Sequence, residues 1–135
     1  MTVRSHVVTG LIVFVGGAIG TCLRALVTVP SDASQTPWIM LGINILGAGL
    51  LGMLVGITGA PVDARARRRH AFLSVGLLGG FTSYSALAID TVMLSLSARP
   101  WLAIVTLTAT LAGGLVASLV GIVGGRVIRA NRARA

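Results

Sequence analysis

The chain contains very few acidic residues. Of its 135 residues only three are carboxylates, Asp32, Asp63 and Asp90, and glutamate is absent. Lysine is absent too, so all eleven basic residues are arginine. Charged residues make up 10% of the sequence, whereas about a quarter of the residues in a soluble domain are charged. Because so few charges cannot cover a water-facing surface, the composition excludes a soluble globular protein.

Metal-binding and nucleophilic side chains are also scarce. Cys22 is the single cysteine, and His6 and His70 are the two histidines. One cysteine forms no internal disulfide and no thiolate metal site, and two histidines do not complete a metal-ligand set. The sequence also shows no nucleophile paired with a base inside the apolar stretches. We therefore expect no enzyme activity.

Apolar residues are what the chain has in abundance. They make up 55% of the sequence, and the mean hydropathy is +0.94. Four apolar stretches cover residues 7–29, 38–58, 72–94 and 101–128. Each has at least the roughly 20 residues that a helix needs to cross a bilayer, and none shows the alternating polarity of a barrel strand. The prediction is one all-α integral membrane domain over residues 1–135, with four transmembrane helices.

The arginines are distributed unequally between the two sides of the predicted bundle. Nine of them lie before the first span, between the second and third spans, or at the end of the chain: Arg4, Arg65, Arg67, Arg68, Arg69, Arg126, Arg129, Arg132 and Arg134. The opposite side has Arg99 alone. Since cytoplasmic loops collect arginine, we expect a multi-pass protein of the cell (inner) membrane with both termini in the cytoplasm. A net charge of +8 placed between lipid-spanning segments suits anionic headgroups, and no nucleic-acid partner is expected.

Small residues recur every four positions in several spans. The rows are Gly113, Ala117, Gly121 and Gly125 in the fourth span, Ala48, Gly52 and Gly56 in the second, and Gly16 and Gly20 in the first. Such rows let helix backbones approach closely in a bilayer. Four closely packed helices cannot easily enclose an aqueous path alone, so we expect an oligomer.

Two polar side chains lie inside the first two spans. Arg24 is near the end of the first span, where it either extends to the interface or attracts an anion. Asn44 lies in the second span, where its amide suits either an interhelical hydrogen bond or a pore lining. Both interpretations stay open for each residue.

The third span contains the most unusual segment. Gly79 and Gly80 are followed by Phe81 and the polar run Thr82-Ser-Tyr-Ser85, in the middle of a hydrophobic stretch. Glycine and hydroxyl residues make a poor continuous helix, so a break near Gly79–Ser83 is predicted. A break frees backbone carbonyls that must find another partner. The competing interpretation is an unbroken helix whose hydroxyls bond its own carbonyls.

Three motifs, in order, resemble those of the CrcB/Fluc fluoride channels. They are Gly16-Gly-Ala-Ile-Gly-Thr-Cys-Leu-Arg24, Asn44-Ile-Leu-Gly47, and the segment from Gly76 to Asp90. Together with the length and the four spans they cover nearly the whole chain. The resemblance implies an antiparallel dimer that exports fluoride passively, lowers its toxic level in the cytoplasm, and holds a structural sodium ion that is not transported.

The resemblance also assigns roles to individual residues. Backbone carbonyls of Gly79 and Thr82 match the sodium ligands, and Arg24 matches a vestibule arginine. The positions implied to line the pore are Asn44, Phe81, Ser83, Tyr84, Ser85 and Leu87. Thr106, Thr110 and Ser118 on the last span match a polar track.

Two departures of the third motif from the family pattern matter, one in its aromatic pair and one at its acidic residue. Where the family has two phenylalanines whose ring edges face the anion, this chain has Tyr84 and Leu87. Tyrosine keeps a ring, but leucine has no polarised edge, and Phe81 is a candidate substitute. Asp90 stands where the family usually has glutamate.

The unequal arginine distribution suggests a second hypothesis about assembly. A self-pairing antiparallel channel inserts in both orientations, so it needs nearly balanced charges. This chain is then one subunit of an obligate heterodimer, with a weakened pore of its own and a homologous partner of opposite bias. The composition also suits a small non-fluoride transporter or a membrane scaffold subunit. A multidrug exporter needs a glutamate in its first span, and this chain has none.

Overall fold

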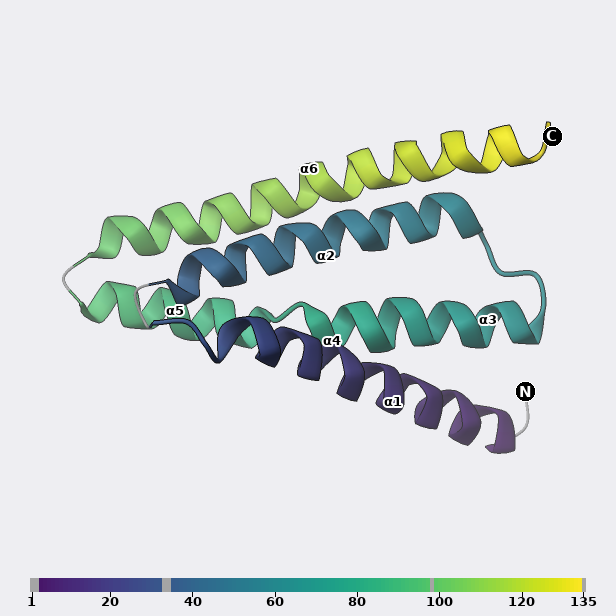
Figure 1. Ribbon diagram of the computed structural model, residues 1–135, viewed down its shortest axis with the longest axis horizontal. Coiled ribbons are helices and arrows are strands. Elements are labelled where there is room, and N and C mark those ends of the chain that lie inside the picture. The colour runs from purple at the N-terminus through teal and green to yellow at the C-terminus, as the bar shows by residue number, and fades with distance from the viewer. Residues whose placement is uncertain (1–2, 33–34, 98, 135) are drawn as a thin grey trace.

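The structure is a computed structural model that describes residues 3–32, 35–97 and 99–134. These residues form helices and short connections, with no strand among them (Figure 1). The elements are α1 (Val3–Thr28), α2 (Thr36–Thr58), α3 (Ala64–Ala71), the π-helix η1 (Phe72–Leu78), α4 (Gly79–Phe81), α5 (Tyr84–Leu96) and α6 (Pro100–Arg132). The predicted all-α class is confirmed.

Four helical segments are long and apolar enough to cross a membrane, as predicted. They cover Ser5–Thr28, Thr36–Thr58, Ala64–Leu96 and Pro100–Arg132. The third begins earlier than its apolar stretch because the arginine-rich α3 continues the helix outward. Asp63 caps this extension, since its Oδ1 accepts a hydrogen bond of 2.6 Å from the backbone N–H of Ala66. Hydropathy therefore located the spans but not the helix ends.

The start of α1, all of α3 and the last turns of α6 lie at the same end of the bundle (Figure 1). We call this the arginine-rich end. The short connection between α5 and α6, which contains Arg99, lies at the opposite end. The fold therefore gathers the arginine-containing segments as the four-span prediction requires.

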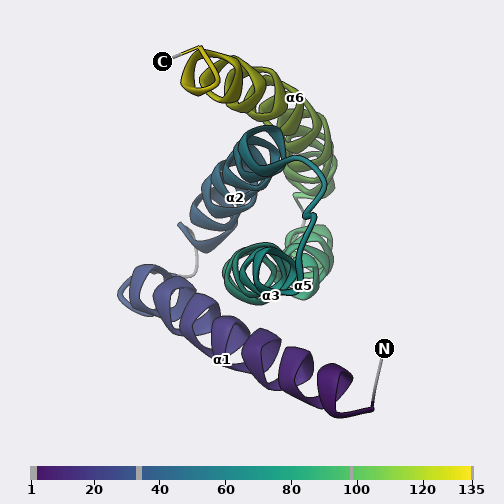
Figure 2. The same ribbon diagram turned by 90° about the vertical axis from the view of Figure 1, so that its right-hand side faces the viewer.

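Helices α2 and α6 form a close pair, separate from α1 (Figure 2). Glycines make this approach possible, because a Cβ at Gly52 would overlap the carbonyl oxygen of Ser118. In the same way, a Cβ at Gly121 would overlap the carbonyl oxygen of Gly49. The small-residue rows predicted from the sequence thus form a helix–helix contact.

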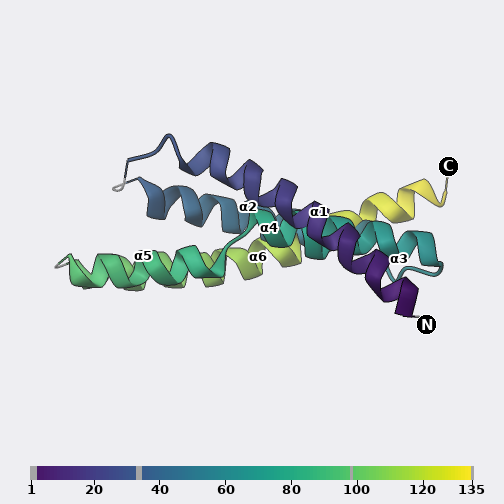
Figure 3. The ribbon, with the colours of Figure 1, turned by 90° about the horizontal axis from the view of Figure 1, so that it is seen from below.

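Helix α1 packs across the first half of the third span (Figure 3). A Cβ at Gly16 would lie 2.7 Å from the carbonyl oxygen of Phe72. A Cβ at Gly20 would overlap the carbonyl oxygen of Leu77, and one at Gly80 would overlap that of Gly17. These contacts fix α1 against η1 and α4, next to the predicted break.

Most large apolar side chains face away from the bundle. Phe14 is 73% exposed and Leu115 is 63% exposed, whereas Met40, Ile43 and Ala103 are buried. A water-soluble monomer does not expose so much contiguous apolar surface. This surface suits lipid or another subunit.

Candidate functional site

The third span is broken at Thr82 and Ser83, as predicted. Thr82 has φ −79° and ψ 156°, and Ser83 has φ −148° and ψ 110°, so both backbones are extended. The helix resumes at Tyr84, where the Ser83 hydroxyl caps α5 by accepting a bond of 3.1 Å from the N–H of Ala86. The competing interpretation, an unbroken hydroxyl-rich helix, is wrong.

Asn44 on α2 holds the break in place with both ends of its amide. Its Oδ1 accepts a hydrogen bond of 2.9 Å from the N–H of Ser83, and its Nδ2 donates one of 3.3 Å to the carbonyl oxygen of Ser83. The N–H of Ser83 is no longer paired within a helix, whereas its carbonyl oxygen also accepts a hydrogen bond of 3.4 Å from the N–H of Leu87. Asn44 supplies the acceptor for this N–H, so of its two predicted uses the structure displays the interhelical hydrogen bond.

The same contacts release two carbonyl groups from helical pairing. In an unbroken helix, the carbonyls of Gly79 and Thr82 would accept from the N–H groups four residues on, those of Ser83 and Ala86. These two N–H groups donate instead to the Asn44 side chain and to the Ser83 hydroxyl. Gly79 and Thr82 are the residues matched to the sodium ligands, so the chemistry of the site fits a cation held by backbone oxygens.

A groove of about 360 Å³ runs beside the break, between the third span, α2 and α6. It brings together seven of the residues singled out from the sequence: Asn44, Gly79, Thr82, Ser83, Tyr84, Leu87 and Thr110. Five others are not among its lining: Arg24, Phe81, Ser85, Thr106 and Ser118. Gly47, Ala48 and Gly114 leave room for it on the facing helices. The groove is the candidate functional site.

The two positions that depart from the phenylalanine pair differ sharply in exposure. Tyr84 is 79% exposed at the groove, while Leu87 is 6% exposed and lies within the bundle. Tyr84 therefore presents its ring and hydroxyl outward, where another molecule or ion can meet them. Leu87 contributes an apolar wall.

Phe81 and Ser85 lie on either side of the break without lining the groove. Phe81 is half-buried, and its ring lies 3.6 Å from the position of a Cβ built at Gly47. The Ser85 hydroxyl lies 3.2 Å from that of Ser83, at hydrogen-bonding distance. Phe81 therefore does not replace the missing second ring in this groove, and Ser85 supports the cap of α5.

Arg24 lies against the break from the α1 side. Its Nε donates a hydrogen bond of 3.4 Å to the carbonyl oxygen of Gly80, and the Thr21 hydroxyl donates to the same oxygen at 3.4 Å. Like Ser83, Gly80 is therefore a residue near the break whose carbonyl oxygen accepts from side-chain donors. This position favours a role at the site over extension to the interface. Sequence analysis missed Thr21, although its place one turn before Arg24 was a usable signal.

The three α6 residues matched to a polar track are placed differently. Thr106 and Thr110 are 2% and 6% exposed, and their hydroxyls donate to carbonyls of their own helix, those of Leu102 at 2.9 Å and Thr106 at 2.7 Å. Ser118 is half-buried, and its backbone packs against Gly52. Only Thr110 reaches the groove.

Comparison with known proteins gives consistent matches along the chain. The family described as "CrcB-like protein, Camphor Resistance (CrcB)" matches residues 11–122. The chain is 38% identical to "Fluoride-specific ion channel FluC 2" of Leifsonia xyli subsp. xyli, over 96% of this chain and 92% of the relative. It is also 38% identical to the protein of that name from Bacillus subtilis, over 86% of each. "Fluoride-specific ion channel FluC" of Agrobacterium fabrum is 36% identical, over 85% of this chain and 94% of the relative.

Proposed function

Since the chain belongs to the CrcB family, whose relatives are fluoride-specific ion channels, we propose that it forms a channel that exports fluoride passively and lowers its cytoplasmic level. It is a channel and not an enzyme. The observation that carries the proposal is the break at Thr82–Ser83, held by Asn44 beside a groove inside the bundle.

Fluoride crosses a membrane only if protein groups replace its water. At the groove, Tyr84 supplies a positively polarised ring edge and a hydroxyl donor, and it is exposed enough to meet an ion. Leu87 and Thr110 complete the wall. Because Thr110 donates its hydroxyl hydrogen within α6, Tyr84 is the principal anion-facing group that this chain contributes. Arg24 acts from the α1 side of the break, as a fixed positive charge.

The carbonyl groups of Gly79 and Thr82 would hold the sodium ion that the family resemblance implies. Their release from helical pairing supports this role. A bound sodium ion supplies fixed positive charge beside the groove, which favours an anion there. Asn44 contributes indirectly, because it accepts a hydrogen bond from the N–H of Ser83, which would otherwise pair with the Gly79 carbonyl.

A second subunit completes the channel. The groove is open, and the exposed Tyr84 is left without a covering element in a single chain. The arginine bias gives one orientation in the inner membrane, with both termini in the cytoplasm. An antiparallel partner must then carry the opposite bias, so the assembly is a heterodimer with a homologous chain, and a homodimer is the competing arrangement.

The first experiment is fluoride efflux from liposomes that contain this purified chain, measured with a fluoride electrode. Rapid efflux that spares chloride supports the channel and rules out an obligate heterodimer. If the chain alone is silent, efflux on adding the opposite-bias homologue supports the heterodimer. Silence under both conditions overturns the proposed function.

The matched variants are Gly79→Leu and Gly124→Leu. Gly79 lines the groove, so a leucine there should block it and reduce efflux by at least about tenfold. Gly124 has nothing within 4 Å of a built Cβ, so the same substitution there should leave efflux unchanged. Equal efflux from the two variants would contradict the assignment of the groove as the pore.

A further inference from the structure

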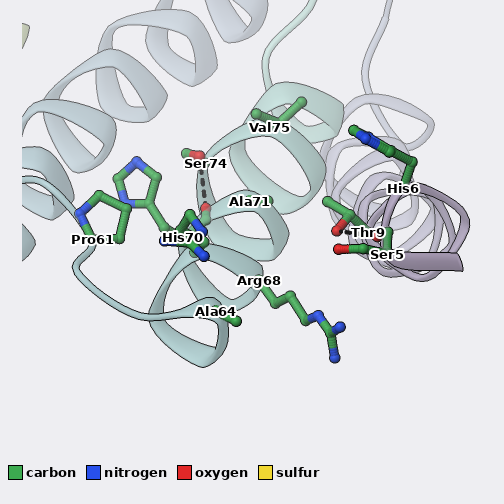
Figure 4. Close-up of a pocket in the computed structure, with 11 residues that line it drawn as sticks. Ser5, His6, Thr9, Pro61, Ala64, Arg68, His70, Ala71, Ser74 and Val75 are labelled. Atoms are coloured by element: carbon green, nitrogen blue, oxygen red, sulfur yellow. Dashed lines mark hydrogen bonds between the residues drawn. The ribbon is translucent and has the colours of Figure 1, made fainter. Parts of the chain in front are cut away.

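A second cavity, of about 350 Å³, lies at the arginine-rich end between the start of α1 and α3 (Figure 4). Its polar lining comes from α1, α3 and η1: Ser5, His6, Thr9, Arg67, Arg68, His70 and Ser74. No acidic side chain is among the described residues that line it. The cavity is therefore a basic hollow outside the candidate pore.

The arginines of α3 divide between different hollows. Arg67 and Arg68 line the basic cavity. Arg65 and Arg69 line a separate hollow together with Asp63, whose carboxylate also caps α3. One pair of charges thus faces a space without a counter-charge, while the other pair shares its space with an acid.

Ser74 joins the basic cavity to the candidate pore. It is 9% exposed, and it lines both the basic cavity and the groove beside the break. Its hydroxyl donates a hydrogen bond of 2.7 Å to the carbonyl oxygen of His70, which fixes the side chain (Figure 4). Ser74 belongs to the π-helical η1, and such distortions are frequent at functional sites. The basic cavity and the groove therefore adjoin at Ser74.

We propose that the basic cavity collects anions at the arginine-rich end and delivers them past Ser74 to the groove, with Arg67 and Arg68 supplying the attracting field. This inference rests on the proposed channel function. It assigns to this chain's own arginines a kinetic role in fluoride transport, in addition to any part in topology.

The physical basis is that a cavity lined by charges of one sign, here positive, concentrates the electrostatic field inside it. A basic hollow with low-dielectric walls raises the local concentration of anions and their association rate by about tenfold or more. At 0.15 M ionic strength the screening length is about 8 Å, so the charges that line the cavity act on an anion inside it most strongly. At 1 M it falls to about 3 Å and the effect should disappear.

The test compares two double variants with the same change of charge on the same helix. Arg67→Gln with Arg68→Gln removes the pair that lines the cavity, and Arg65→Gln with Arg69→Gln removes the pair that does not. Fluoride efflux is measured in liposomes, with the partner homologue present if it is required. We expect the first variant to be about threefold slower or more at 0.15 M and equal to wild type at 1 M, and the second to match wild type at both.

A second measurement does not depend on fluoride efflux. Thr9→Cys is placed in the cavity on a Cys22→Ser background, and its reaction rates with an anionic and a cationic methanethiosulfonate reagent are compared. The anionic reagent should react faster, and the preference should fall when Arg67 and Arg68 are replaced but not when Arg65 and Arg69 are replaced.

Equal efflux from the two double variants, or equal reagent preference, would overturn the inference while leaving the channel intact. Failure of the channel itself is recognised separately, since wild-type protein would then show no efflux at any salt concentration.

Discussion

At the scale of single residues, Asn44 is the side chain on which the break depends most. It pairs both polar groups of Ser83, a residue 39 positions away in the sequence. An unpaired backbone group inside a bilayer costs several kcal/mol, so these two bonds make an extended segment tolerable there. The same bonds keep the Gly79 carbonyl out of the helix. The Asn44 amide thus stabilises the break and also leaves the Gly79 carbonyl available at the site.

We expect Asn44→Ala to lower fluoride efflux by at least about tenfold, because the loss of two hydrogen bonds at about 1–1.5 kcal/mol each releases the break. The variant should also melt at a lower temperature in detergent. Asn131→Ala is the control, since Asn131 is exposed near the end of α6. Efflux at the wild-type rate from Asn44→Ala would show that the break does not need this residue.

At the scale of elements, glycine determines which helices meet. The α2–α6 pair and the contact of α1 with the third span both place backbone against backbone, where no Cβ fits. Without a hydrophobic force between helices in lipid, close van der Waals contact is what holds them together. Since α1 carries Arg24 and Thr21 to the break, its packing also positions the site.

Two glycines of α1 provide a matched test of this packing. A Cβ at Gly20 would overlap the carbonyl oxygen of Leu77, whereas Gly10 has nothing within 4 Å. We expect Gly20→Val to destabilise the protein by about 1–3 kcal/mol, because α1 must shift away from the third span. Gly10→Val should change stability much less. Thermal melting in detergent measures both, and equal melting temperatures would contradict the packing argument.

At the scale of the whole molecule, the distribution of arginines in the sequence agrees with the way the fold places the segments that contain them. The segments that contain most of the arginines lie at one end of the bundle, and α6, which Arg99 directly precedes, begins near the other (Figure 1). The bundle is thin, with most of its large apolar side chains exposed and an open groove at its middle. These features are the basis of the two proposals that the chain inserts in one orientation and that a partner covers the groove.

The orientation can be measured with a cysteine at the arginine-rich end. In an Arg134→Cys protein on a Cys22→Ser background, we expect protection from a membrane-impermeant thiol reagent added outside intact cells. Replacing the four arginines of α3 with glutamine should make labelling mixed, whereas Arg99→Gln should not. Labelling of about half of the otherwise unaltered molecules from outside would contradict the single orientation and favour a homodimer.

The sequence by itself determined the membrane class and the four spans, and it predicted where a break would lie. These follow from local chemistry, because a bilayer demands apolar side chains and internally paired backbone over each span. The glycines and hydroxyls of the third span are equally local, so the position of the break at Thr82–Ser83 was predictable. The motifs also pointed to the family, since most of the residues that carry the resemblance are close neighbours in the chain.

Only the tertiary structure decided which groups meet. The structure pairs Asn44 with Ser83 and brings Arg24 and Thr21 to the carbonyl oxygen of Gly80. It also places Ser74 in the lining of two hollows. All three results depend on how helices that are distant in the sequence pack together. Helix crossings are set by small-residue contacts between elements, and no local pattern specifies their partners. The physical reason is that a hydrogen bond needs a donor and an acceptor close together. The sequence specifies which donors and acceptors the chain has, and the packing of the helices determines which of them lie close together.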